Sequence, residues 1–176
     1  EEVRDTMLAT AGRLRLEPMG GPGFRLYKYT QNNVSTYFPL DTHGPETYRR
    51  AVYHQNARAS VVDVLTDFDL PDIAFAAPRR ANTTSPLQAL TLLNDPVFFA
   101  AAGKLAERLE AIPGESDARL KAGFELCLGR PPSPSELQAL RRHHSDQLAI
   151  SGGDERLALV STARLLLNLD EFITRE

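Results

Sequence analysis

The sequence has little cysteine, no tryptophan and no long hydrophobic run. Its single cysteine, Cys127, excludes an internal disulfide framework and any zinc or iron–sulfur site built from several cysteines. No stretch approaches the roughly 20 apolar residues that a membrane-spanning helix requires. With 42% hydrophobic and 24% charged residues, the 176-residue chain has the composition of a soluble globular protein that can enclose a core.

Several functional classes also lack their usual sequence features. A formal net charge of -3 gives no basic surface for nucleic acid, so no nucleic-acid partner is expected. The sequence contains no phosphate-binding glycine loop, no nucleophile elbow and no Cys-Xaa-Xaa-Cys-His haem attachment. We therefore expect no cofactor and no metal in this chain, and the sequence favours a non-catalytic role. Because the sequence starts at Glu1 inside an amphipathic pattern, without an initiator Met or signal peptide, we expect it to be a fragment of a longer protein.

Helix-start patterns dominate the chain after residue 84. Ser85, Pro86 and Gln88 form a capping box, in which a hydroxyl and an amide side chain satisfy the first backbone N–H groups of a helix. Further starts are predicted at four positions: Asp95, Ser116, Ser133 and Asp154. Residues 85–170 are therefore predicted to form five helices joined by short loops.

The first half of the chain is less regular. Apolar residues at helical spacing predict a helix over 1–16, followed by a Pro/Gly-rich turn at 18–23. Aromatic and β-branched residues around Thr30–Asn33 predict a hairpin within 24–40, and 41–80 shows no sustained periodicity. The predicted fold is mostly α, a bundle of five to six helices with a small irregular region that contains a β-hairpin. We expect a single domain over 1–176, divided into 1–23, 24–84 and 85–176.

Charged residues of the irregular segment are the main candidates for a site. The carboxylates of Asp63, Asp67, Asp69 and Asp72 could converge on a hard cation, but the glycine and the bidentate Glu of a calcium loop are missing. The doublets Arg49-Arg50 and Arg79-Arg80 could hold a planar acid between two guanidinium groups. Ion pairs between these arginines and the aspartates explain the pattern as well, and we favour that structural interpretation.

The histidines and the cysteine give weaker indications. His144 shares a predicted apolar stripe with Leu137 and Leu140, a position more typical of a hydrogen-bonded core residue than of a ligand. His143 points about 100° away from it on a helix, so the two cannot chelate together unaided. Cys127 lies on an apolar helix face and is interpreted as a small hydrophobic residue.

Four strings carry a family resemblance. They are YRRAVY at 48–53, TDFDLPD at 66–72, PRRANTTSPLQALTLLNDP at 78–96 and LNLDEF at 167–172. Together they resemble the planctomycete domain of unknown function 1553, a C-terminal module of large multidomain proteins. The resemblance implies upstream domains of the same polypeptide, often a cytochrome-c-like haem domain and in some members a carbohydrate-binding module, and export to the periplasm or cell surface. It supplies no catalytic residues.

Two functions from different classes follow as hypotheses. The first is a non-catalytic structural or interaction module of a large exported protein. The alternative is an accessory part of an enzyme or redox system acting on complex polysaccharide, in which an Arg/Asp groove contacts a carbohydrate ligand. Electron transfer would belong to a neighbouring haem domain. The candidate residues for a ligand groove or an interdomain contact are Arg49, Arg50, Asp67, Asp69, Arg79, Arg80 and Asn94.

Overall fold

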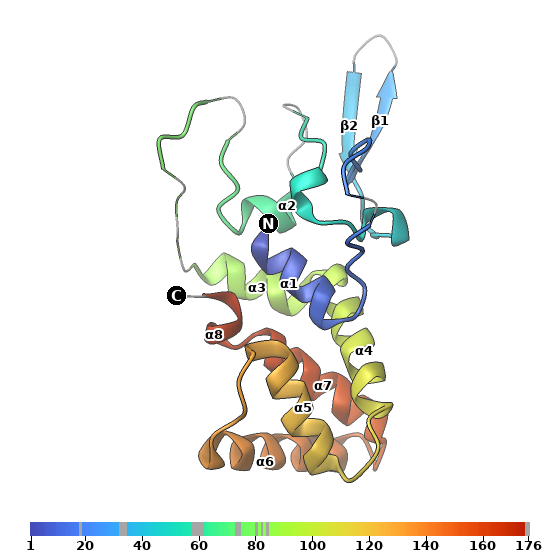
Figure 1. Cartoon of the computed structure of the whole chain (residues 1–176), viewed down its shortest axis with the longest axis vertical. Helices are drawn as coiled ribbons and strands as arrows, with labels where there is room; N and C mark the ends of the chain where they lie inside the picture. Colours follow the sequence, from blue (N-terminus) through green and yellow to red (C-terminus); the bar gives the residue numbers. More distant parts are fainter. Residues whose placement is uncertain are drawn as a thin grey trace. The chain divides into compact units, whose positions relative to one another are not determined.

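The computed structural model describes residues 1–17, 19–31, 35–57, 62–72, 75–79, 81, 83 and 85–174. This part of the chain contains eight α-helices, two short 3₁₀ helices and one antiparallel strand pair (Figure 1). The prediction of a mostly helical fold with a small β-hairpin is confirmed. None of the described helices combines the length and the apolar character that a membrane crossing requires.

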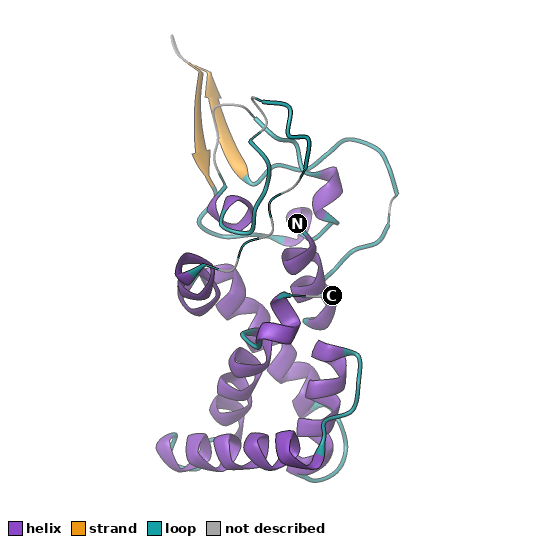
Figure 2. Cartoon of the chain, turned by 90° about the vertical axis from the view of Figure 1, so that its left-hand side faces the viewer, coloured by secondary structure: helices purple, strands orange, loops and turns teal. Residues whose placement is uncertain are grey.

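The chain gathers into two compact units. One consists of residues 1–9 and 13–97, and the other of residues 10–12 and 98–176. The two strands, orange in Figure 2, fall within the residues of the first unit, and the regular structure of the second unit is helical. The single-domain organisation of residues 1–176 stays a prediction.

The elements before residue 95 are short. In chain order they are α1 (Glu2–Thr10), β1 (Tyr27–Gln31), β2 (Ser35–Pro39), η1 (Pro45–Thr47), η2 (Ala51–Tyr53), α2 (Asp63–Thr66) and α3 (Pro86–Asn94). The helix predicted over 1–16 ends at Thr10, because Gly12 adopts a left-handed backbone with φ of 68°. The N–H groups of Arg13 and Leu14 then both donate to the Leu8 carbonyl oxygen, at 2.7 and 3.0 Å.

The hairpin forms where aromatic residues predicted it. β1 and β2 pair antiparallel, with Tyr29 opposite Tyr37 and their ring centroids 5.1 Å apart. Such cross-strand aromatic pairs stabilise a two-stranded sheet. β1 continues to Gln31, so half of the predicted 30–33 turn belongs to the strand, and its other half, residues 32 and 33, lies outside the described residues.

The predicted capping boxes are confirmed. The N–H of Gln88 donates to Ser85 Oγ at 3.3 Å, and the N–H of Ser85 donates to Gln88 Oε1 at 3.1 Å. Ser133 and Glu136 repeat this exchange at 3.3 and 2.7 Å. Each box satisfies backbone N–H groups that a helix start would leave without a partner, so the residue types themselves set where the helix begins.

The second unit is built from five helices. They are α4 (Pro96–Glu110), which begins at the end of the first unit, α5 (Ser116–Leu128), α6 (Pro134–Ile150), α7 (Glu155–Leu167) and α8 (Asp170–Ile173). α6 lies across α5 and α7 (Figure 1). The predicted cap at Ser116 is displaced by one residue, because Glu115 occupies the N-cap position. The Ser116 hydroxyl instead donates to Glu155 Oε1 at 3.3 Å.

The core of the second unit is aliphatic. α7 buries one side, including Leu159 and Leu166 at 0% exposure, whereas Leu157 on the same helix is 56% exposed. Leucines occur around most of the circumference of this helix in the sequence. Packing against the other helices determines which of them face the core. His144 is buried there, with Nδ1 3.4 Å from Thr162 Oγ1 and Nε2 3.3 Å from Glu155 Oε2. These contacts agree with the predicted core role of His144.

Candidate functional site

A surface groove between α2 and α3 contains part of the predicted site. It has a volume of about 530 Å³ and is open to solvent. Its described lining residues are Asp63, Asp67, Leu87, Leu90, Thr91, Asn94 and Asp95. All seven belong to the first unit. The groove therefore combines three carboxylates with two leucine side chains and contains two of the predicted site residues, Asp67 and Asn94.

Two threonines hold Asp67 and Asp69 by hydrogen bonds. The Thr91 hydroxyl donates to Asp67 Oδ2 at 2.5 Å. The N–H and the hydroxyl of Thr83 donate to the two carboxylate oxygens of Asp69, at 2.7 and 2.8 Å. Asp69 has a φ of 60°, an unfavourable conformation for a residue other than glycine, and these two bonds help to hold it there. The aspartates thus tie the segment after α2 to residues 83–91.

The groove carboxylates do not make a metal cluster. Among the residues that the structure describes, no three His, Cys, Asp or Glu side chains gather as a metal ion would require. Asp63 is exposed at the first position of α2, and Asp95 accepts the N–H of Val97 at 2.7 Å at the start of α4. Their positions give the groove a negative border.

Arg49 and Arg50 contact other parts of the first unit. The Arg49 guanidinium donates to the carbonyl oxygens of Pro22 and Gly20, at 2.7 and 2.6 Å, and lies 4.4 Å from the centre of the Tyr53 ring. It therefore fixes the Pro/Gly-rich turn that follows α1. Arg50 is 59% exposed, and its Nε lies 3.5 Å from Asp5 Oδ2. Neither arginine lines the groove between α2 and α3.

The remaining candidates lie on or beside the segment between α2 and α3. Asn94 ends α3, where its Nδ2 donates to the Leu90 carbonyl oxygen at 3.0 Å. Arg79 is exposed, and Arg80 lies outside the described residues. The structure thus brings Asp67 and Asn94 into one groove, connects Asp69 to Thr83 near the start of α3, and places Arg49 and Arg50 elsewhere.

A buried arginine near the N-terminus was not anticipated. Arg4 is only 2% exposed, and its guanidinium donates to the carbonyl oxygens of Thr47 and of Arg49, the latter at 3.0 Å. It also lies 3.4 Å from Asp5 Oδ1 and 5.2 Å from the centre of the Phe24 ring. Burial lowers the pKa of Arg4, and Asp5 opposes this effect. The sequence offered no indication of this role, because a charged residue in an amphipathic helix is expected to face water.

Two histidines lie close to Arg4. Burial, together with the positive charges of Arg4 and His54, lowers the pKa of His43 to about 4, and Glu46 opposes this effect. Burial also lowers the pKa of His54, whose Nδ1 is 2.9 Å from Asn56 Oδ1. Both imidazoles are therefore neutral in the folded protein at pH 7. The side chains of Arg4, His43 and His54 form what we call the Arg4 cluster. None of the three is a predicted site residue, although Arg4 donates to the carbonyl oxygen of Arg49.

We expect the first unit to lose stability as the pH falls from about 6.5 to 4. An unfolded His43 takes up a proton near its ordinary pKa of 6.5, whereas the folded residue does so only near 4. Between these values the unfolded chain binds more protons, so the free energy of unfolding decreases with falling pH. Because the side chain is partly exposed, we expect a loss of about 1–2 kcal/mol.

Urea unfolding of the native chain and of His43→Gln at pH 7.5 and 4.5 measures this effect. The variant should show a smaller difference between the two pH values, with a remainder due to His54. Equal pH dependence in both proteins would contradict the assignment to His43.

Cys127 is buried in the second unit. Burial raises the pKa of its thiol to about 12, and the nearby charge of Arg108 reduces this effect. A thiol with this pKa holds almost no nucleophilic thiolate at pH 7. The environment agrees with the prediction that Cys127 is a small hydrophobic residue.

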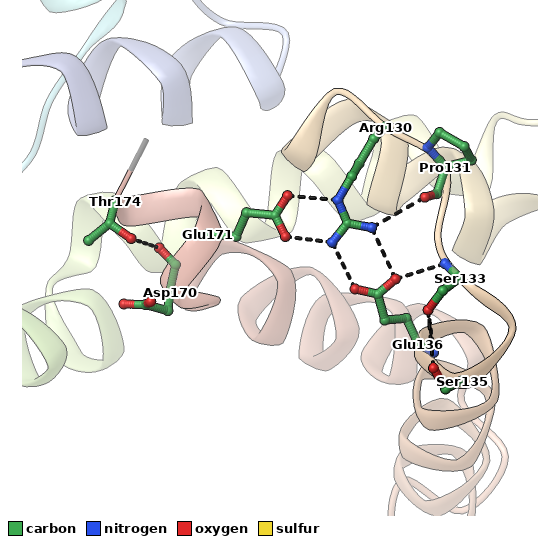
Figure 3. A network of polar contacts seen from close by, with 8 residues as sticks. All are labelled: Arg130, Pro131, Ser133, Ser135, Glu136, Asp170, Glu171 and Thr174. Atoms are coloured by element: carbon green, nitrogen blue, oxygen red, sulfur yellow. Dashed lines mark hydrogen bonds and ion pairs between the residues drawn. The ribbon is translucent and has the colours of Figure 1, made fainter. Parts of the chain in front are cut away.

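A second polar network joins the loop between α5 and α6 to α6 and α8 (Figure 3). The Arg130 guanidinium donates to both oxygens of Glu136, at 2.8 and 3.0 Å, and to both oxygens of Glu171, at 2.5 and 2.8 Å. Glu136 also accepts the N–H of Ser133 in the capping box. Arg130 and Ser133 together lower the pKa of Glu136 to about 2. The Glu136 capping role was predicted, whereas its pairing with Arg130, which also binds Glu171, was not.

Replacing Arg130 with glutamine should raise the pKa of Glu136 from about 2 toward its ordinary value of 4.5. The bonds to Ser133 remain and should keep the pKa below 4.5. In the native protein the stabilisation from Glu136 is complete above pH 4.5 and disappears as the pH falls through about 2. Carbon-detected NMR titration of the Glu136 carboxyl measures the shift.

Arg141→Gln provides the matched control for this titration. Arg141 is also a surface arginine, but it pairs with Asp117 instead of Glu136. Its replacement should leave the pKa of Glu136 unchanged. The same pKa of Glu136 in the native protein and in Arg130→Gln would show that the Arg130 contacts do not hold the carboxylate.

Comparison with known proteins places the chain in a family without an assigned function. No curated protein matches the sequence, and no solved structure matches the fold. The model of one family matches residues 1–144, a span that contains the groove, the Arg4 cluster and Glu136. The chain therefore belongs to the family described as a protein of unknown function (DUF1553).

Proposed function

We propose that this chain is a non-catalytic interaction module of a larger exported protein. The observation that carries the proposal is the outer face of α3, which presents three leucines to solvent. Leu87, Leu90 and Leu93 are 56%, 55% and 46% exposed. Leucines repeated on one helix face are normally covered by another surface, because burying apolar area is favourable.

The polar residues support the same proposal. Arg49 binds carbonyl oxygens of its own unit, and Asp69 binds Thr83. The Cys127 thiol is buried. A nucleophile paired with a base, the usual basis of covalent catalysis, is not among these contacts. The charged residues thus serve to fix loops in place.

The alternative function, a carbohydrate-binding Arg/Asp groove in a polysaccharide-acting system, has less support. It requires arginine and aspartate side chains to face one cavity, so that both can contact a ligand. Asp67 and Asn94 line the groove between α2 and α3, but Arg49 and Arg50 contact the Pro/Gly-rich turn and Asp5. We therefore favour the interaction module.

Deletion of this chain from a longer protein that carries it tests the proposal. The truncated protein should be exported in lower yield, or should lose the association that the module provides. Both can be measured by quantifying the exported protein and by crosslinking within its assembly. Unchanged folding, export and association after deletion would refute the proposed function.

A further inference from the structure

The exposed face of α3 has a regular geometry. Leu87, Leu90 and Leu93 recur every third residue, so they follow one side of the helix over about 9 Å. Gln88 and Leu92 point the other way and are only 4% and 3% exposed. One side of α3 is therefore buried in its own unit, and the opposite side exposes its leucines to solvent.

The charge beside this face is of one sign. Leu87 and Leu90 line the groove together with Asp63, Asp67 and Asp95, and no lysine or arginine occurs among its described lining residues. Asp63 is exposed on α2, where its carboxylate is available to a partner. The α3 face therefore places an apolar stripe next to carboxylates that have no cation among the described groove residues. Such a surface is complementary to a partner that combines apolar side chains with positive charge.

We infer that the α3 face and its acidic groove bind a basic amphipathic helix of a partner protein. The inference rests on the proposed interaction function and specifies the chemistry of the partner. An amphipathic helix places its apolar side chains three or four residues apart, which matches the leucine spacing on α3. Lysine or arginine on the flanks of that helix would then lie near Asp63 and Asp95. Anionic partners such as nucleic acid would be repelled by the same carboxylates.

Peptide binding to the full 176-residue chain tests this inference. The probe is a fluorescein-labelled helical peptide of about 14 residues, four helical turns, composed only of leucine and lysine in amphipathic order. Its control has glutamate in place of every lysine. Fluorescence anisotropy should show binding of the lysine peptide at least about tenfold tighter than that of the glutamate peptide, with weaker binding at higher salt.

Substitutions in the chain locate the binding surface. Leu90→Gln should weaken binding of the lysine peptide by about tenfold, since it places a polar group in the centre of the apolar contact. Asp63→Asn should weaken binding by about threefold and reduce its salt dependence. Leu157→Gln is the matched control, because Leu157 is also 56% exposed but lies on α7; it should bind like the native chain. Far-UV circular dichroism verifies that each variant is folded.

Three results would overturn the inference. The first is equal binding of both peptides, and the second is native affinity in Leu90→Gln. The third is concentration-dependent dimerisation that Leu90→Gln abolishes, because it would identify a second copy of the chain as the occupant.

The two proposals also fail in different ways. No peptide binding together with an effect of the deletion refutes the partner chemistry alone. Peptide binding without any effect of the deletion refutes the proposed function alone.

Discussion

Replacement of Arg4 with methionine should lower the free energy of unfolding of the first unit by about 3 kcal/mol. Methionine fills part of the space but cannot donate to the carbonyl oxygens of Thr47 and Arg49, which accept from the guanidinium. It also removes the positive charge beside Asp5. Removing the guanidinium lowers the free energy of unfolding by more than these contacts contribute to it in the native protein. The reason is that the carbonyl oxygens remain buried without a hydrogen-bond donor.

Arg50→Met is the matched control for this replacement. Arg50 also approaches Asp5, at 3.5 Å, but it is 59% exposed, so its removal should cost about 0.5 kcal/mol or less. Tyrosine fluorescence during urea unfolding reports on the first unit, since the chain has no tryptophan and all five tyrosines lie within residues 27–53. Equal losses in both variants would contradict the importance of the buried contacts.

Replacement of Leu159 with alanine should destabilise the second unit by about 3 kcal/mol. Leu159 is 0% exposed on α7, within the core formed with α5 and α6. The shorter side chain loses the free energy of burying its methyl groups and leaves a cavity that the surrounding helices fill only partly. Far-UV circular dichroism in urea measures the loss, because the regular structure of this unit is helical.

Leu157→Ala is the control on the same helix. Leu157 is 56% exposed, so the same chemical change should shift the free energy of unfolding by about 0.5 kcal/mol or less. A loss in this variant as large as that of Leu159→Ala would mean that Leu157 is covered in solution.

The candidate site could be predicted only in part. Asp67 and Asn94 lie in the strings used to identify the family, and the structure places both in the groove between α2 and α3. Asp95 was explained as a helix cap, yet it also borders that groove. The arginines were expected beside the aspartates because opposite charges attract. Arg49 instead donates to the carbonyl oxygens of Gly20 and Pro22, neutral groups that composition and spacing do not single out.

The sequence alone determined the features that depend on neighbouring residues. The capping boxes of Ser85 with Gln88 and of Ser133 with Glu136 each join residues three positions apart, so their geometry follows from local backbone conformation. Tertiary structure decided the burial of Arg4 against Thr47, the bond from Arg49 to Gly20, and the pairing of Arg130 with Glu171, which is 41 residues away. These contacts depend on the path of the whole chain, which no local pattern encodes. The exposed side of α3 was decided in the same way, because the periodicity of its leucines does not say which side the rest of the unit covers.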